Sequence, residues 1–450
     1  MAKESNFFHI ENKSYITAWV LITICFALWG FANNVTTPMV GTFSKIFRIS
    51  TTEASLVPVV FNMGYFCLAF PAAMFIQKYS YKWGVLVGLG LYAIGTLLFL
   101  PAKMAGSFYP FLSAYFILTC GLSFLETSSN PYIYSLGSQK TAIPRLNAAQ
   151  AFNAIGSLVG MAIAGSIHSH IIPMDSRIRM QLPAKQFEIV KAHDLDILIQ
   201  PYIYIGAVVV LVFVLVYLLK LPNDTDIHTT KGTWSILGNL LKHKNYREGV
   251  IAEFFYVGAQ VTCWTFIIQY GTRIFTAEGM TEQAAEVLSQ KYNAFAMFLF
   301  VCGRFICTWL MRWFSPSRLL STLGIIGIVA LLGTIFFTDR NGIYCLVMVS
   351  GCLSLMFPTI YGLALVGVGD EIKIASAGLV MAILGGSFFP PIQAALIQSQ
   401  ISLLGLPCTN VSFLIPLICL LVVVWYGHRT YVRFHIISDD GMPTVRPTAE

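Results

Sequence analysis

Twelve apolar stretches dominate this sequence of 450 residues, and each is long enough to cross a bilayer as a helix. A transmembrane helix needs about 20 predominantly apolar residues to span the hydrocarbon core. The predicted spans are Ile16–Val40, Ala54–Ile76, Trp83–Leu100, Phe108–Tyr134, Leu146–Ile167, Tyr202–Leu221, Val250–Tyr270, Tyr292–Met311, Leu319–Phe337, Ile343–Val366, Ala375–Leu396 and Phe413–Tyr426. We therefore expect an all-α membrane protein with twelve transmembrane helices.

The low charge content supports a membrane location and argues against a soluble fold. Charged residues make up 11% of the sequence and hydrophobic residues 56%, whereas soluble domains carry roughly 25% charged residues. The net charge of +7 does not indicate nucleic acid, because the Lys and Arg residues lie in short connectors between apolar runs. We expect both termini and the longest polar connector to be cytoplasmic, as the positive-inside rule predicts.

A polar connector divides the spans into two sets of six. We predict an N-terminal six-helix half at residues 1–221, a cytoplasmic linker at 222–246, and a C-terminal six-helix half with a short tail at 247–450. This arrangement is typical of transporters whose halves rock around a substrate bound near the bilayer midplane. In the eleventh span, the pair Gly385 and Gly386, followed by two prolines, predicts a broken helix.

Glu126 is the most unusual residue inside a predicted span, because no basic residue lies near it in the sequence. A charge at a helix centre costs about 2.5 to 3.5 kcal/mol on insertion scales. A carboxyl group in such an environment holds a proton more readily and is suited to carry one. The alternative is a neutral Glu that bonds to a neighbouring helix. The polar residues that follow Glu126 lead us to predict that this segment is functional.

Amides and hydroxyls in the first and fifth spans are candidate sugar ligands. Asn33, Asn34 and Thr37 cluster before a proline, while Gln150 and Asn153 are three residues apart and share a helix face. The hydroxyl groups of a sugar need such hydrogen-bonding partners. For any one of these residues, a hydrogen bond between helices is an equally good explanation. As a cluster, they favour a cavity.

The seventh span places an aromatic ring, an amide and an indole on one face, because Tyr256, Gln260 and Trp264 recur every fourth residue. This surface suits a sugar, which presents apolar C–H faces between polar rims. The alternative is a packed helix interface. Glu253 and Arg304 are charges near the ends of the seventh and eighth spans, where we expect them to pair or snorkel in gating or structural roles.

Motifs for catalysis are missing from the sequence. It contains no zinc-protease motif, no phosphate-binding loop, no nucleophile elbow and no dinucleotide-binding glycine pattern after a strand. We therefore do not expect an enzyme, a cofactor or a metal site. Transport would be coupled to an ion gradient rather than to ATP hydrolysis on this chain.

Several segments, in order along the whole chain, resemble the major facilitator superfamily and, within it, the fucose:proton symporter family of sugar permeases. They are ALWGFANN, QKYSYKWGVLVGLGLYAIG, LSFLETSSNPY, RLNAAQAFN, FFYVGAQVTCWTFIIQY, GRFICTWLMRWFSPSRLL and FPTIYGLAL. The basic loop general to the superfamily is present in a degenerate form around Lys78 and Lys82. We assign gating or structural roles to these two lysines.

The resemblance implies proton-coupled symport of fucose or a related hexose by alternating access. It also implies an essential glutamate at Glu126 and sugar contacts at Asn34, Gln150 and Asn153. The resemblance also implies a multi-pass protein of a bacterial inner membrane. We expect a monomer whose partners are a small sugar, a coupling proton or alternatively Na⁺, and the lipid bilayer.

Two departures from the family pattern affect the expected mechanism. The family's characterised fucose symporter has an aspartate where this chain has Thr37, and Phe357 stands where a tyrosine is expected among the substrate contacts. Three mechanisms stay open: proton carriage by Glu126 alone, Na⁺ coupling near Thr36 and Thr37, and uncoupled facilitation. Glucose, galactose and N-acetylhexosamine are alternative substrates, and a sugar sensor that does not transport is a further alternative.

Overall fold

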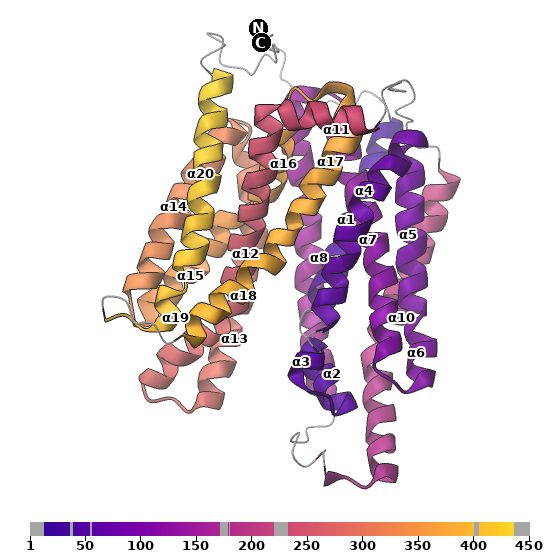
Figure 1. Ribbon diagram of the computed structural model, residues 1–450, viewed down its shortest axis with the longest axis vertical. Helices are drawn as coiled ribbons and strands as arrows, with labels where there is room; N and C mark the ends of the chain where they lie inside the picture. The colour runs from indigo at the N-terminus through magenta and orange to yellow at the C-terminus, as the bar shows by residue number, and fades with distance from the viewer. Residues whose placement is uncertain are drawn as a thin grey trace. The chain divides into compact units, whose positions relative to one another are not determined.

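The computed structural model describes residues 13–36, 39–54, 56–171, 179, 181–219, 233–399 and 405–435. Within these ranges twelve helical segments are long and apolar enough to cross a membrane. They are Ile16–Thr36, Leu56–Lys78, Tyr81–Ala105, Tyr109–Ser135, Gln139–Ile167, Ala184–Leu218, Lys244–Ala277, Glu282–Leu310, Pro316–Phe336, Arg340–Ala364, Gly369–Gln398 and Cys408–Phe434. Each overlaps one predicted span, so the predicted all-α fold with twelve transmembrane helices is confirmed (Figure 1).

The chain packs as two compact units, and the N-terminal unit comprises residues 10–136 and 152–228. Its helices are α1 (Lys13–Thr36), α2 (Met39–Phe47), α3 (Thr51–Ala54), α4 (Leu56–Lys78), α5 (Tyr81–Leu97), α6 (Phe99–Ala105), α7 (Tyr109–Ser135), the later part of α8 (Ala142–His170) and α10 (Ala184–Leu218). Helix α7 packs extensively against α4 and α5. A Cβ atom on Gly121 would lie 2.5 Å from the amide nitrogen of Tyr92. Glycine is therefore what lets α5 and α7 approach so closely.

Among the described residues, the C-terminal unit comprises residues 137–151, 233–399 and 405–435. Its elements are η1 (Gln139–Thr141), the first part of α8, α11 (Thr233–Lys242), α12 (Lys244–Ala277), α13 (Glu282–Leu310), α14 (Pro316–Phe336), α15 (Arg340–Leu353), α16 (Met356–Ala364), η2 (Gly369–Glu371), α17 (Ile372–Met381), η3 (Ala382–Leu384), α18 (Gly385–Gln398), α19 (Cys408–Val411) and α20 (Leu414–His435). Helix α12 is central and packs against α13, α16, α18 and α20. Figure 1 shows α12 beside α18.

The eleventh span is interrupted, as the glycines predicted. A 3₁₀ turn, η3, separates α17 from α18, and the interruption lies directly before Gly385, while both prolines are inside α18. A Cβ atom on Gly385 would lie 1.9 Å from the carbonyl oxygen of Phe254 in α12. The glycine is therefore needed for the close contact between α12 and α18.

Three helices, α8, α10 and α11, differ from what the apolar runs in the sequence predicted. Helix α10 begins at Ala184, well before the predicted span, because polar residues outside the membrane continue the same helix. The predicted linker contains a helix, α11, in its described part. Helix α8 begins in the C-terminal unit, since residues 137–151 pack there, and continues in the N-terminal unit. The predicted division into halves at 221 and 247 stays a prediction.

Candidate functional site

Glu126 lies inside α7 and is completely buried. Neither of its carboxyl oxygens has a hydrogen-bond partner among the described residues. An ionised carboxylate in these surroundings would be strongly destabilised, because nothing replaces the water that it loses. An ionised Glu126 would therefore need water or a polar partner to reach its carboxyl group.

Tyr65 of α4 contacts the first span and also interacts with Glu126. Its hydroxyl group donates to Oδ1 of Asn33 in α1 at 3.4 Å, and it interacts electrostatically with the Glu126 carboxyl group. The Ser123 hydroxyl donates to the backbone carbonyl of Tyr65 at 3.3 Å, which ties α4 to α7. Sequence reasoning missed Tyr65, although a tyrosine within the apolar second span was an available signal.

Two of the polar residues that follow Glu126, Ser128 and Asn130, bond to their own helix. The Ser128 hydroxyl donates to the carbonyl of Phe124 at 2.6 Å, and the Asn130 amide donates to the carbonyl of Glu126 at 3.2 Å. Side chains of these types often bond to the carbonyl four residues earlier. Their polarity is thus partly satisfied within α7, and Glu126 differs from them.

Among the predicted side-chain amides, that of Asn153 connects α8 to α1, and that of Asn34 bonds within α1. Asn153 Nδ2 donates to the carbonyl of Phe26 at 3.1 Å, and Asn34 Nδ2 donates to the carbonyl of Gly30 in its own helix at 3.3 Å. A Cβ atom on Gly30 would lie 2.0 Å from the carbonyl oxygen of Asn153, so the two backbones are in close contact. Thr37, a predicted ligand, lies outside the described residues.

Arg304 of α13 is buried, with 3% of its surface exposed. Its Nε donates to the carbonyl of Ser354 at 2.5 Å, and its Nη1 donates to the carbonyl of Gln150 in α8 at 3.0 Å. The guanidinium carbon lies 4.6 Å from the centroid of the Phe300 ring. Arg304 therefore does not snorkel to the membrane interface, but joins the fifth and tenth spans to α13 inside the C-terminal unit.

Of the predicted aromatic contacts, Tyr256 and Phe357 lie close together, whereas Trp264 packs against Phe300. The rings of Tyr256 in α12 and Phe357 in α16 have centroids 6.4 Å apart. Trp264 packs edge-on against Phe300 with a centroid distance of 4.9 Å. Its buried indole N–H has no acceptor among the described residues, and the half-buried Gln260 lies one turn before it on α12. This helix therefore presents an aromatic surface with an unused hydrogen-bond donor.

The remaining predicted charges have different surroundings. Glu253 is completely buried one turn before Tyr256 and interacts with it electrostatically. Lys82 donates to the carbonyls of Tyr217 and Leu219 at 3.1 and 2.9 Å. A cation is favourable at this end of α10, because the helix dipole is negative there. Lys78 is exposed at the end of α4.

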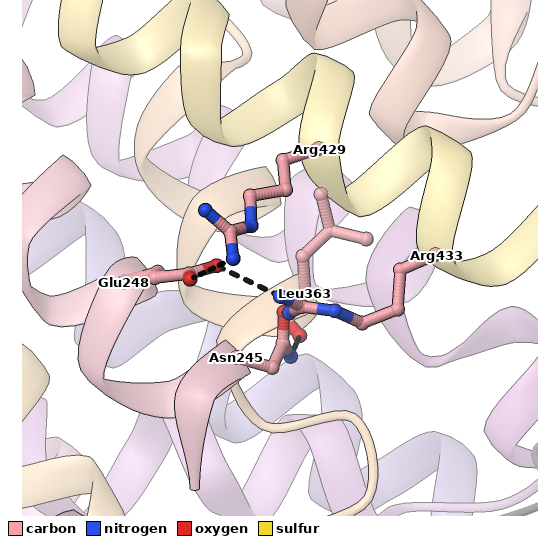
Figure 2. Close-up of polar contacts among 5 residues, drawn as sticks. All are labelled: Asn245, Glu248, Leu363, Arg429 and Arg433. Carbon is pink, nitrogen blue, oxygen red and sulfur yellow. Dashed lines mark hydrogen bonds and ion pairs between the residues drawn. The ribbon is translucent and has the colours of Figure 1, made fainter. Parts of the chain in front are cut away.

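Figure 2 shows a charge cluster that connects three helices at the beginning of α12. Glu248 of α12 pairs with Arg429 and Arg433 of α20 at 3.3 and 3.0 Å. Arg433 also donates to Oδ1 of Asn245 at 3.1 Å, and Asn245 donates to the carbonyl of Leu363 in α16 at 2.7 Å. The cluster thus fixes α12 to α16, the two helices that carry the predicted aromatic contacts.

Comparisons with known proteins agree with this architecture. The family model described as Major Facilitator Superfamily matches residues 22–390. The L-fucose-proton symporter of Haemophilus influenzae is 44% identical over 431 residues, which cover 94% of this chain and 98% of that protein. The L-fucose-proton symporter of Escherichia coli K12 is 33% identical over 388 residues, which cover 85% of this chain and 87% of that protein.

Among solved structures, a crystal structure of the E. coli fucose:proton symporter FucP is similar to this chain with a TM-score of 0.83. The two sequences are 30% identical, and the match covers 93% of this chain and 99% of that one. The similarity therefore extends through both units.

Proposed function

Because the chain belongs to the major facilitator superfamily and, within it, to the fucose:proton symporter family, we propose that it imports L-fucose or a related hexose together with a proton. The observation that carries this proposal is the complete burial of Glu126 without a hydrogen-bond partner among the described residues. A carboxyl group placed in this way can alternate between a protonated and an ionised form when its surroundings alternate between closed and water-exposed. We assign proton coupling to Glu126.

Sugar contacts are assigned to side chains with donors, acceptors or aromatic faces. An indole N–H without an acceptor, as at Trp264, suits a sugar hydroxyl. Asn33 and Gln150 each supply a side-chain amide. The full proposed set is Asn33, Asn34, Thr37, Gln150, Asn153, Tyr256, Gln260, Trp264 and Phe357.

The proposed setting is a bacterial inner membrane with both termini and the linker in the cytoplasm. The distribution of Lys and Arg residues supports this orientation. We propose that the protein works as a monomer, without an enzyme activity, and that Glu253, Arg304, Lys78 and Lys82 have gating or structural roles.

A second candidate mechanism follows from Thr37, which replaces the family aspartate. With one carboxyl group fewer, Na⁺ could be the coupling ion, or transport could be uncoupled. Thr36 is buried, and its hydroxyl donates to the carbonyl of Ala32 at 2.8 Å. Oxygen atoms of this kind are ligands for hard cations, so sodium dependence is tested alongside proton uptake.

The experiment is sugar-dependent alkalinisation. Fucose, galactose, glucose and N-acetylglucosamine are added in turn to weakly buffered, de-energised cells that express the protein, and the external pH is recorded. We expect the pH to rise with one sugar in the wild type and to stay flat in Glu126→Gln. Labelled sugar should still exchange across the membrane in Glu126→Gln, because the sugar contacts are intact.

Other outcomes separate the alternatives. A flat pH trace with labelled sugar entering only in sodium would establish Na⁺ coupling, and entry without either ion would establish facilitation. Sugar binding without entry would indicate a sensor. Complete loss of sugar binding in Glu126→Gln would make Glu126 a sugar ligand and contradict its coupling role.

A further inference from the structure

The tenth span is broken in its middle. Helix α15 ends at Leu353 and α16 begins at Met356, so Ser354 and Leu355 lie between two helical segments. Part of the cause is Pro358, which has no amide N–H to donate to the carbonyl of Ser354 four residues earlier. In a membrane, backbone groups freed in this way need partners from neighbouring helices.

Arg304 supplies the donor that the proline lacks. Its Nε donates to the carbonyl of Ser354 at 2.5 Å, and both residues are buried. The second donor, Nη1, bonds to the carbonyl of Gln150 at 3.0 Å. One buried guanidinium therefore satisfies the broken span and holds it to α8.

Tyr256 occupies the other side of the break. Its hydroxyl group donates to the carbonyl of Leu353 at 3.2 Å and also interacts with the backbone of Phe357. Residues 353 and 357 would be hydrogen-bond partners in an unbroken helix. A side chain inserted into this ladder bends a helix, so the Tyr256 hydroxyl helps to set the angle at which α16 leaves the break.

The residue placed by this arrangement is Phe357. It is half-buried, whereas its neighbours Met356 and Pro358 are buried. Its ring lies between those of Tyr256 and Tyr361, with centroid distances of 6.4 and 6.3 Å. The orientation of this ring depends on the backbone at its own position, which Tyr256 contacts directly.

We infer that Tyr256 and Arg304 are positioning residues, which hold the break in the tenth span so that Phe357 presents its ring to the sugar. This inference rests on the proposed sugar transport. It assigns the Tyr256 hydroxyl to the protein backbone and leaves only the aromatic ring of Tyr256 among the proposed sugar contacts.

The test compares Tyr256→Phe with Tyr270→Phe, a matched variant on the same helix. The Tyr270 hydroxyl also donates to backbone carbonyls, those of Thr334 at 2.7 Å and Phe337 at 3.1 Å, but at the end of α14. In purified protein, Tyr256→Phe should weaken sugar binding about fivefold, as expected for one buried hydrogen bond. Tyr270→Phe should leave the Kd unchanged, and an equal change in both variants would overturn the inference.

A double-mutant cycle with Phe357→Ala separates positioning from direct contact. If Tyr256 acts through Phe357, removing its hydroxyl should cause little further loss of affinity once the ring is gone. Independent losses that add would mean that the hydroxyl contacts the sugar and that the positioning role is wrong. Arg304→Lys should show the same non-additivity with Phe357→Ala.

Hydrogen–deuterium exchange provides a readout that needs no sugar. The amides of residues 353–357 and 359 should exchange faster in Tyr256→Phe than in the wild type or in Tyr270→Phe. Unchanged exchange would overturn the inference even if sugar binds. If exchange changes but none of the four sugars binds the wild type, the tenth-span contacts stand and the proposed transport function fails.

Discussion

Glu126 in the N-terminal unit and Arg304 in the C-terminal unit are both buried ionisable residues inside membrane spans. Their bonding differs. Arg304 donates to two backbone carbonyls, whereas the Glu126 carboxyl has no hydrogen bond from the described residues. Burial of a charged residue therefore does not by itself indicate transport chemistry. The unmet hydrogen-bonding capacity of Glu126 supports its proposed role in proton coupling, and the two bonds of Arg304 support a proposed structural role.

The comparison predicts a much larger loss of stability on substitution of Arg304 than on substitution of Glu126. Arg304→Met should lower the free energy of unfolding by about 3 kcal/mol, because the buried Ser354 carbonyl loses its donor and the bond to the Gln150 carbonyl is also lost. Glu126→Gln should change it by less than about 1 kcal/mol, because no bond is lost. Thermal unfolding of both variants in detergent measures the difference. A larger loss for Glu126→Gln than for Arg304→Met would show that Glu126 has a structural role.

Tyr65 tests whether the surroundings of Glu126 contribute to coupling. Tyr65→Phe removes the hydroxyl that contacts Asn33 and interacts with Glu126. We expect about a fivefold lower rate of proton-coupled uptake, with sugar affinity retained. The matched control is Tyr115→Phe, which removes another buried hydroxyl of the same unit, bonded to Tyr202 at 2.7 Å. Equal effects of the two variants on coupled uptake would argue against a role of Tyr65 in coupling.

The Glu248 cluster should contribute a smaller, purely structural effect. Glu248→Gln weakens the pairing with Arg429 and Arg433, which are partly exposed. Solvent screening limits the expected loss to about 1 kcal/mol, seen as a fall of a few degrees in Tm. Glu278→Gln, which weakens an exposed pair with Arg340 at 2.8 Å, is the control and should leave Tm unchanged. A loss of coupling without a change in Tm in Glu248→Gln would contradict this assignment.

Several features of the site could be anticipated from the sequence because they depend on neighbouring residues alone. Glu126 stands out because no basic residue is near it along the chain. In the folded unit, its two carboxyl oxygens likewise have no hydrogen-bond partner among the described residues. The break in the eleventh span follows from local glycines and was expected. The break in the tenth span, at Ser354, was not anticipated, although Pro358 was its signal.

The sequence by itself determined the twelve spans and the isolation of Glu126. Hydropathy is a sum over adjacent residues, and lipid accepts only helices that satisfy their own backbone. Only the tertiary structure decided that Tyr65 reaches Asn33, that residues 137–151 pack with the C-terminal unit, and that Arg304 bonds to Ser354. Such pairs depend on the rotation and depth of helices distant in the chain. Packing between helices, rather than any local pattern of residues, sets both quantities.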